Sequence, residues 1–281
     1  QVAVQQGLAN EENNLVPRLK WWWTCRLCEQ HHHGAVESAL GWACWKTYLG
    51  RQEGDWAHMS AMRHLGNGLS DGDHHEDALA VQEAELSMKL RLGAPENMIL
   101  VVQGNIAITY RTLDRNEDAL RILRDVYSGY LKLRGGEHMN SLIAALNVAQ
   151  SLIDLHRFEE AKSLLRRVLP AARRVLGECD DLTLGMRRNY AQTLYADPAA
   201  TLDDLRKAVT TLEEAAPIAR RVFSGTHPLT VDIEGSLRES RAVLAAREAP
   251  VQEKLAQECS EIAKTLADTT LDGEETPPDR A

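Results

Sequence analysis

The four residues GNIA at positions 104–107 recur as LNVA at 146–149 and as RNYA at 188–191, so an Asn returns every 42 residues. An acidic element ending in Ala accompanies them, as EDA at 76–78, EDA at 117–119 and EEA at 159–161. A Gly closes successive units at positions 50, 93, 135, 177 and 225. Three independent markers with one period indicate a structural repeat, and a repeat determines the architecture of the whole chain.

Each unit is expected to form two helices. From Met98, apolar residues such as Val102 and Ile106 recur at helical spacing, and Leu120 and Leu123 continue the pattern in a second stretch. The Gly that closes each unit can adopt the left-handed conformation that ends a helix. Small residues stand where paired helices would cross, and a larger side chain there would push the backbones apart: Gly66, Ala78, Ala107, Ala119, Ala149, Ala161 and Ala191. The sequence therefore predicts an all-α chain of helical hairpins.

The period also predicts how the chain is divided. The repeat array spans about 55–245. Within it, an insertion over 196–200 lengthens one turn, because Pro198 cannot lie inside a helix without breaking it. Residues 1–54 are expected to form a Trp-, Cys- and His-rich hairpin or cap whose first helix carries Trp21, Trp22 and Trp23. After a last repeat helix over 230–243, a separate helix within 246–267 is expected to cap the array. The acidic tail 268–281 is expected to be disordered. Because the sequence begins at Gln1, we expect a segment to precede it.

These residues resemble the tetratricopeptide repeat, with a Gly or Ala inside the first helix and an acidic-Ala element opening the second. The pitch of 42 and the endings Arg91-Leu92-Gly93 and Val175-Leu176-Gly177 resemble the kinesin light chain subclass. No heptad segment for binding a motor heavy chain accompanies them, so the resemblance concerns the repeats alone. It implies a right-handed α-α superhelix that serves as a protein–protein interaction scaffold, and it is unspecific for the partner.

The resemblance also implies which residues bind a ligand, because in this family the first helices line a concave groove. A carboxamide offers both a donor and an acceptor, so a ladder of amides can pair with the backbone of an extended peptide. The alternative is that these amides face solvent or join adjacent repeats. His64, Arg111 and Arg188 together form a mildly basic stripe, which favours a peptide with acidic residues. The candidate groove residues are His64, Asn67, Asn105, Ile108, Asn147, Gln150, Arg188, Asn189 and Gln192.

Several classes of function find no support in the sequence. It contains no phosphate-binding loop, zinc-protease, serine-hydrolase or calcium-loop motif, so we expect no enzyme and no cofactor. The formal net charge of −9 argues against nucleic-acid binding. No apolar run approaches the ~18 residues that a membrane helix needs. The five cysteines are scattered and no Asn-x-Ser/Thr sequon occurs, which favours a cytoplasmic location. The oligomeric state is not indicated.

Two alternatives concern the amino-terminal end. Cys25, Cys28, His32 and Cys44 include a Cys-x-x-Cys pair near imidazoles and could hold Zn²⁺, although two Cys on adjacent turns of a buried helix more often serve packing. Five of the six Trp lie between positions 21 and 45. If they are exposed, this end is a contact surface and the chain is a regulatory or oligomerisation arm of a larger assembly. If they are buried, they form a core.

Overall fold

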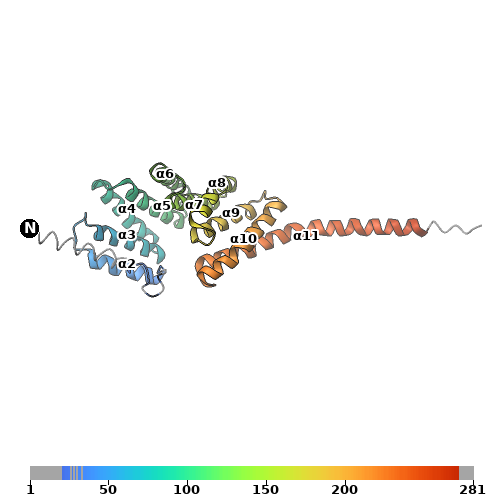
Figure 1. The fold of residues 1–281 in the computed structure, drawn as a ribbon, viewed down its shortest axis with the longest axis horizontal. Coiled ribbons are helices and arrows are strands. Elements are labelled where there is room, and N and C mark those ends of the chain that lie inside the picture. The colour runs from blue at the N-terminus through green and yellow to red at the C-terminus, as the bar shows by residue number, and fades with distance from the viewer. Residues whose placement is uncertain (1–20, 26, 28, 30, 33, 272–281) are drawn as a thin grey trace, which may run out of the picture. The chain divides into compact units, whose positions relative to one another are not determined.

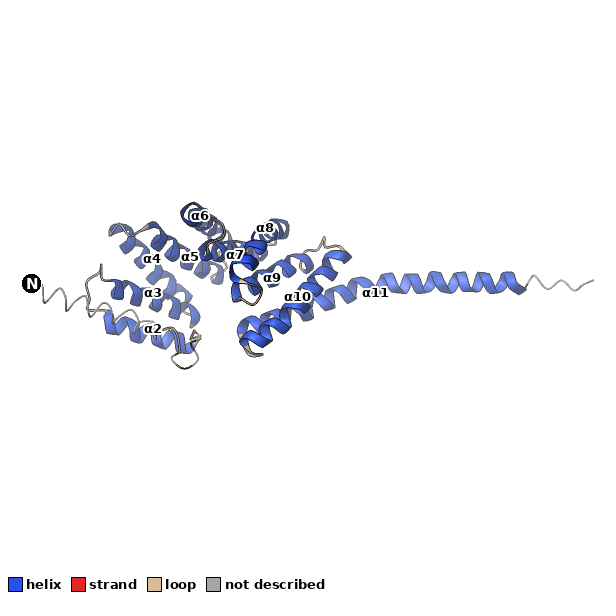
Figure 2. Cartoon of the chain, in the orientation of Figure 1, coloured by secondary structure: helices blue, strands red, loops and turns tan. Residues whose placement is uncertain are grey.

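The computed structural model describes residues 21–271, except residues 26, 28, 30 and 33. Within these residues the chain forms ten helices and no β-strand, and Thr24 and His31 form an isolated bridge (Figures 1 and 2). The predicted all-α fold is confirmed. In the described part of the chain, no helix is long and apolar enough to cross a membrane. The helices are α2 (Ala35–Tyr48), α3 (Trp56–Asp71), α4 (His75–Arg91), α5 (Glu96–Thr112), α6 (Asn116–Arg134), α7 (Met139–Asp154), α8 (Phe158–Leu176), α9 (Asp181–Tyr195), α10 (Leu202–Phe223) and α11 (Pro228–Leu271).

Successive helices pack against each other from α2 to α7, and again from α9 to α11, and this repeated pairing makes the fold an all-α solenoid. The first helices of the repeats are α3, α5, α7 and α9, and the second are α4, α6, α8 and α10. Neighbouring first helices also touch, α3 with α5 and α5 with α7. The chain divides into two compact units at Val175 and Leu176, so α3 to α7 lie in the first unit and α9 to α11 in the second.

The turns follow the period as closely as the helices do. The turn inside each of three hairpins has one residue in the left-handed region, with φ of 62°, 60° and 56° at Asp73, Asp114 and His156. The turn between hairpins uses Gly93, Gly135 and Gly177 in the same way. At the last turn the left-handed residue is Ser224, with a φ of 79°. The expected residue, Gly225, comes one position later in the chain.

The small residues that were expected at helix crossings are buried. Ala78, Ala107, Ala119, Ala149, Ala161 and Ala191 are each fully buried. At Gly66, which is also buried, an added Cβ would lie 3.1 Å from Cγ of Gln82 on α4. These positions therefore set how closely the two helices of a hairpin approach.

The two ends of the chain depart from the prediction. The prediction of a separate capping helix within 246–267 is wrong, because α11 runs unbroken from Pro228 to Leu271 with Pro250 inside it. Residues 244–250 contain no Gly or Asn that would favour a left-handed helix end. The side chains described between 252 and 263 are exposed, so this stretch does not cap the array. Residues 268–271 of the expected tail belong to α11, and residues 272–281 lie outside the described residues.

At the amino-terminal end, the helix expected over Trp21 to Trp23 is also wrong, because these residues form turns. The backbone N–H of His32 donates to the carbonyl of Trp23 at 3.0 Å, and this contact folds the segment back on itself. Residues 1–20 lie outside the described residues.

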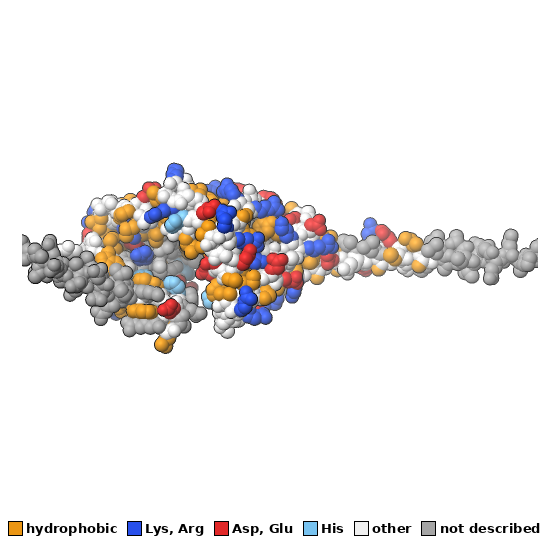
Figure 3. All heavy atoms as spheres, in the orientation of Figure 1, with side chains coloured by type: hydrophobic (Ala, Val, Ile, Leu, Met, Phe, Trp, Pro, Cys, Tyr) orange, Lys and Arg blue, Asp and Glu red, His pale blue; other side chains and the backbone are white. Residues whose placement is uncertain are grey.

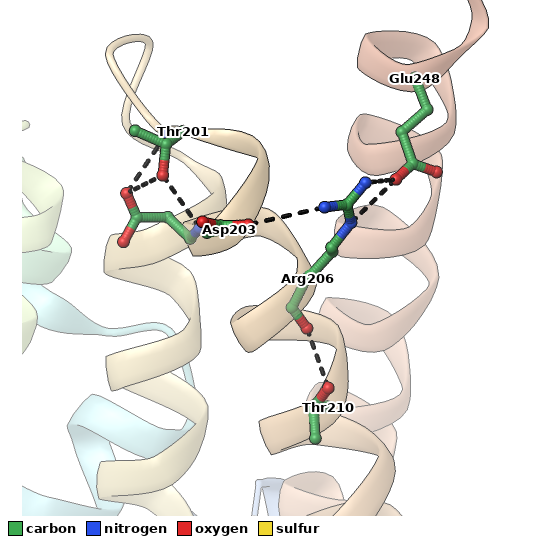
Figure 4. Close-up of polar contacts among 6 residues, drawn as sticks. Thr201, Asp203, Arg206, Thr210 and Glu248 are labelled. Atoms are coloured by element: carbon green, nitrogen blue, oxygen red, sulfur yellow. Dashed lines mark hydrogen bonds and ion pairs between the residues drawn. The ribbon is translucent and has the colours of Figure 1, made fainter. Parts of the chain in front are cut away.

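In the second unit, the long turn predicted at 196–200 separates α9 from α10. Thr201 opens α10 with a capping box, in which its hydroxyl accepts from the backbone N–H of Asp204 while the Asp204 carboxylate accepts from Thr201 (Figure 4). Arg206 on α10 then pairs with Glu248 on α11 at 2.8 Å. The capping box fixes the start of α10, and the ion pair joins α10 to α11.

Candidate functional site

The first unit has a pocket of about 220 Å³ where α5 and α7 lie side by side above α6. Most of its lining is apolar, and amide side chains border it. Its floor comes from α6, where burial raises the pKa of Tyr130 and the hydroxyl of that residue donates to the backbone carbonyl of Asn97 at 3.4 Å. The lining residues are Leu100, Val101, Gly104, Asn105, Ile108, Val126, Tyr130, Asn140, Ile143, Ala144 and Asn147.

Gly104 leaves this pocket open. A Cβ added at Gly104 would meet no atom within 4 Å, so the space above its backbone is unfilled. Gly in the middle of a helix usually costs about 0.5–1 kcal/mol relative to Ala. The missing side chain gives the pocket access to the backbone of α5 and to the amide of the adjacent Asn105.

A second pocket, of about 310 Å³, adjoins the first and shares Asn105 and Ile108 with it. We call the two pockets together the groove. Asn105 lies at the boundary, where its Nδ2 donates to Oδ1 of Asn67 at 3.1 Å. The second pocket is polar, with lining residues His31, His32, Glu37, Asn67, Ser70, Asp71, Gln82, Asn105 and Ile108. Four of the candidate groove residues, Asn67, Asn105, Ile108 and Asn147, are thus brought together.

Residues 98–174, which contain every lining residue of the first pocket, match the family model of the tetratricopeptide repeat. This stretch of the chain is therefore similar to tetratricopeptide repeats. A comparison with curated protein sequences finds no significant match.

Several solved structures share the fold of this chain. One from Podospora anserina, a putative kinesin light chain with nearly identical repeats, is 18% identical with a TM-score of 0.56 over 74% of this chain and 96% of its own. BtubC (BKLC) from P. vanneervenii is 16% identical with a TM-score of 0.57 over 88% and 94%. A Rap protein complexed with competence and sporulation factor is 13% identical with a TM-score of 0.50 over 75% and 60%. At these identities the likeness shows the fold alone.

His64 is absent from the lining of the groove. The ring of Trp23 stacks on it, with the ring centroids 4.1 Å apart and the planes 12° from parallel. Burial, together with the nearby charge of Arg63, lowers the pKa of His64 to about 4. His64 is therefore neutral at pH 7 and covered by an aromatic ring, which removes it from the expected basic stripe.

The expected basic stripe also loses Arg111. Its Nε donates to Oδ2 of Asp154 at 2.9 Å, and this ion pair joins α5 to α7. Gln150, a candidate groove residue, donates to the other oxygen of Asp154 at 2.8 Å. Arg111 and Gln150 thus both bind the carboxylate of Asp154 on α7. This carboxylate balances the charge of Arg111.

The remaining candidates lie in the second unit. Of the recurring Asn105, Asn147 and Asn189, which form the predicted amide ladder, Asn189 is only 3% exposed and is therefore not accessible to a ligand. Its Oδ1 accepts from Nη1 of Arg188 at 3.1 Å, and both Arg188 and Gln192 are half-buried. The open amides of the ladder are Asn105 and Asn147.

The amino-terminal alternatives can be examined only in part, because Cys28 lies outside the described residues. In the part that is described, no group of three His, Cys, Asp or Glu side chains could hold a metal ion. Cys44 is fully buried in an apolar cluster, where burial, and then the charge of Glu37, raise the pKa of its thiol to about 12. A zinc ligand must be a thiolate, so this environment opposes metal binding. His32 lines the polar pocket instead.

The Trp residues form a core at this end. Trp22, Trp23, Trp45 and Trp56 pack against a buried cluster that contains Cys44 and Tyr48. Trp42 is 45% exposed and Trp21 is half-buried. The broad aromatic contact surface that the regulatory-arm alternative requires is therefore not formed by the described residues.

Proposed function

We propose that the tetratricopeptide array is a protein-interaction scaffold whose first unit binds an extended peptide of a partner protein in the groove. Tetratricopeptide repeats in general support protein–protein interaction, and the Rap protein of similar fold was crystallised with a factor. The observation that carries the finer proposal is the open pocket over Gly104, which is apolar inside and bordered by the amides of Asn105 and Asn147.

This arrangement suits a peptide in two ways. The pocket accepts an apolar side chain, since Leu100, Val101, Ile108 and Ile143 line it. The amides at its border can donate to a backbone carbonyl and accept from a backbone N–H whatever the peptide sequence is. The pocket thus supplies affinity for one side chain, and the amides hold the backbone of the peptide.

The proposal does not retain the acidic ligand. The basic stripe that favoured such a ligand lost His64 to burial and Arg111 to its ion pair with Asp154. On the face drawn in Figure 3, Lys and Arg side chains are interspersed with Asp and Glu side chains. Burial of an apolar side chain is the main source of affinity in our proposal, and the chain acts by binding alone. A cytoplasmic location remains part of the same proposal.

The test is a selection of random peptides against the full chain, followed by titration of a selected peptide into variants. Gly104→Leu should weaken binding by about tenfold or more, because the new side chain fills the space of the peptide's apolar residue. The fold should be retained, since the position is open and loses a helix-destabilising Gly. The matched control is Ser128→Leu, which adds the same side chain to an exposed position on α6. Equal affinities of the two variants would contradict the proposed groove.

A further inference from the structure

The polar pocket of the groove carries negative charge without a matching cation. Two of its nine lining residues are carboxylates, Glu37 from α2 and Asp71 from α3, and none is Lys or Arg. The other titratable side chains in the lining are His31 and His32. The pocket therefore offers an environment for a positively charged group that the described residues do not supply.

Glu37 is the central feature of this pocket. It is only 8% exposed, and its Oε2 has no hydrogen-bond partner among the described residues. An unpaired buried carboxylate is costly, so a partner from outside the chain would be strongly favoured. The backbone holds Glu37 firmly in place, because α2 lies so close to α3 that a Cβ on Gly68 would be 2.7 Å from the carbonyl oxygen of Glu37. The two helices are therefore packed closely where Glu37 begins, and the backbone that carries its side chain is fixed against α3.

The neighbouring amides complete the pocket. Oε1 of Gln82 accepts from the hydroxyl of Thr109 at 2.8 Å, which fixes that amide. Asn67 presents its Oδ1 to Asn105, and a carbonyl oxygen has a second lone pair. Around the carboxylate there are thus further acceptors for a ligand that carries several N–H donors.

We infer that this pocket binds the guanidinium group of an arginine side chain on the bound peptide. The inference rests on the proposed function and specifies its ligand. A guanidinium has a planar fork of donors that pairs with a carboxylate through two hydrogen bonds, which a single ammonium does not match. Because Asn105 and Ile108 line both pockets, the arginine lies next to the apolar residue that fills the pocket over Gly104.

The binding should depend on pH. Burial, and then the charge of Asp71, raise the pKa of Glu37 to about 7, so a proton competes with the guanidinium for the carboxylate. The charged and titratable groups that face Glu37 are Asp71 on α3, Cys44 on its own helix, and His31 and His32 in the preceding segment. Protonation of Glu37 removes the negative charge with which the guanidinium pairs. Affinity should therefore fall as the pH is lowered from 8 to 6.

The test uses two small probes on the full chain, Nα-acetyl-arginine amide and its neutral isostere Nα-acetyl-citrulline amide, titrated by NMR at pH 8. We expect the arginine probe to bind about tenfold more tightly than the citrulline probe. Glu37→Gln should remove this preference. The control Asp125→Asn, which removes the same charge from an exposed position on α6, should leave it intact. Equal binding of the two probes, or equal losses in the two variants, would overturn the inference.

The experiment separates this inference from the proposed function. Gly104→Leu fills the apolar pocket, so it should weaken the selected peptides and leave the arginine probe unaffected. Selected peptides without arginine, together with no preference for the arginine probe, would overturn the guanidinium site and leave the peptide groove standing. Binding of the arginine probe with no peptide selected would support the guanidinium site and contradict the proposed function.

Discussion

Lys89→Ala should lower the free energy of unfolding by about 3–5 kcal/mol, as removing one partner of a buried ion pair generally does. Nζ of Lys89 lies 2.6 Å from Oε1 of Glu85 one turn earlier on α4, and each side chain is only 1% exposed. The other oxygen of Glu85 has no partner among the described residues. Without Lys89, the Glu85 carboxylate would be a buried charge with no compensation. Urea unfolding followed by circular dichroism measures the loss.

Two controls accompany this variant. Arg91→Ala breaks the ion pair with Glu53, whose two side chains are 63% and 59% exposed, and it should cost less than about 1 kcal/mol. The double variant Glu85→Gln with Lys89→Met should recover most of the loss, because neither replacement leaves a charge buried. A loss for Lys89→Ala no larger than that for Arg91→Ala would show that the pair is not buried in solution.

Glu37→Gln should stabilise the protein at pH 8, by about 3 kcal/mol from the size of the pKa shift. The carboxyl has a pKa of about 7 in the folded chain against 4.5 for an unperturbed Glu, mainly because it is buried. Folding therefore favours the protonated form. The stability that this preference gives is present below pH 4.5 and is lost as the pH rises to about 7. The Gln variant has no such loss, so its advantage should be small at pH 4.5 and reach its full value above pH 7.

Urea unfolding of the parent chain and of Glu37→Gln between pH 4.5 and 8 tests both the sign and the size of this change in stability. Asp125→Asn serves as the control, because Asp125 is exposed on α6 and its change should be nearly independent of pH. A Gln variant that is less stable than the parent chain at pH 8 would mean that the carboxylate already has a cationic partner within the chain. That result would contradict the guanidinium site as well.

The repeat itself could be predicted because its markers have physical causes. Ala119 and Ala161 recur where helices cross, and Gly135 and Gly177 recur where the backbone is left-handed. Each of these sites tolerates few residue types, so the period is visible in one sequence.

Whether each Asn of the amide ladder is open or buried could not be predicted, because this depends on the residue that precedes it. Asn105 follows Gly104, which leaves it open, whereas Asn189 follows Arg188, whose guanidinium donates to it. The polar pocket was missed for a related reason. Its residues His31 and His32 come from a segment outside the period, and Glu37 becomes unusual only when α2 packs against α3.

The central claim is that a peptide binds along α5 and α7, and site-directed photo-crosslinking tests it most directly. A photoreactive phenylalanine derivative replaces Ile143, which is 42% exposed at the border of the apolar pocket. The same derivative replaces Trp42 at the amino-terminal end and Ser128 on α6 in two control chains. A selected peptide should crosslink from position 143 alone, and excess unlabelled peptide should abolish the product. Crosslinking from position 42 or 128 with none from 143 would contradict the account.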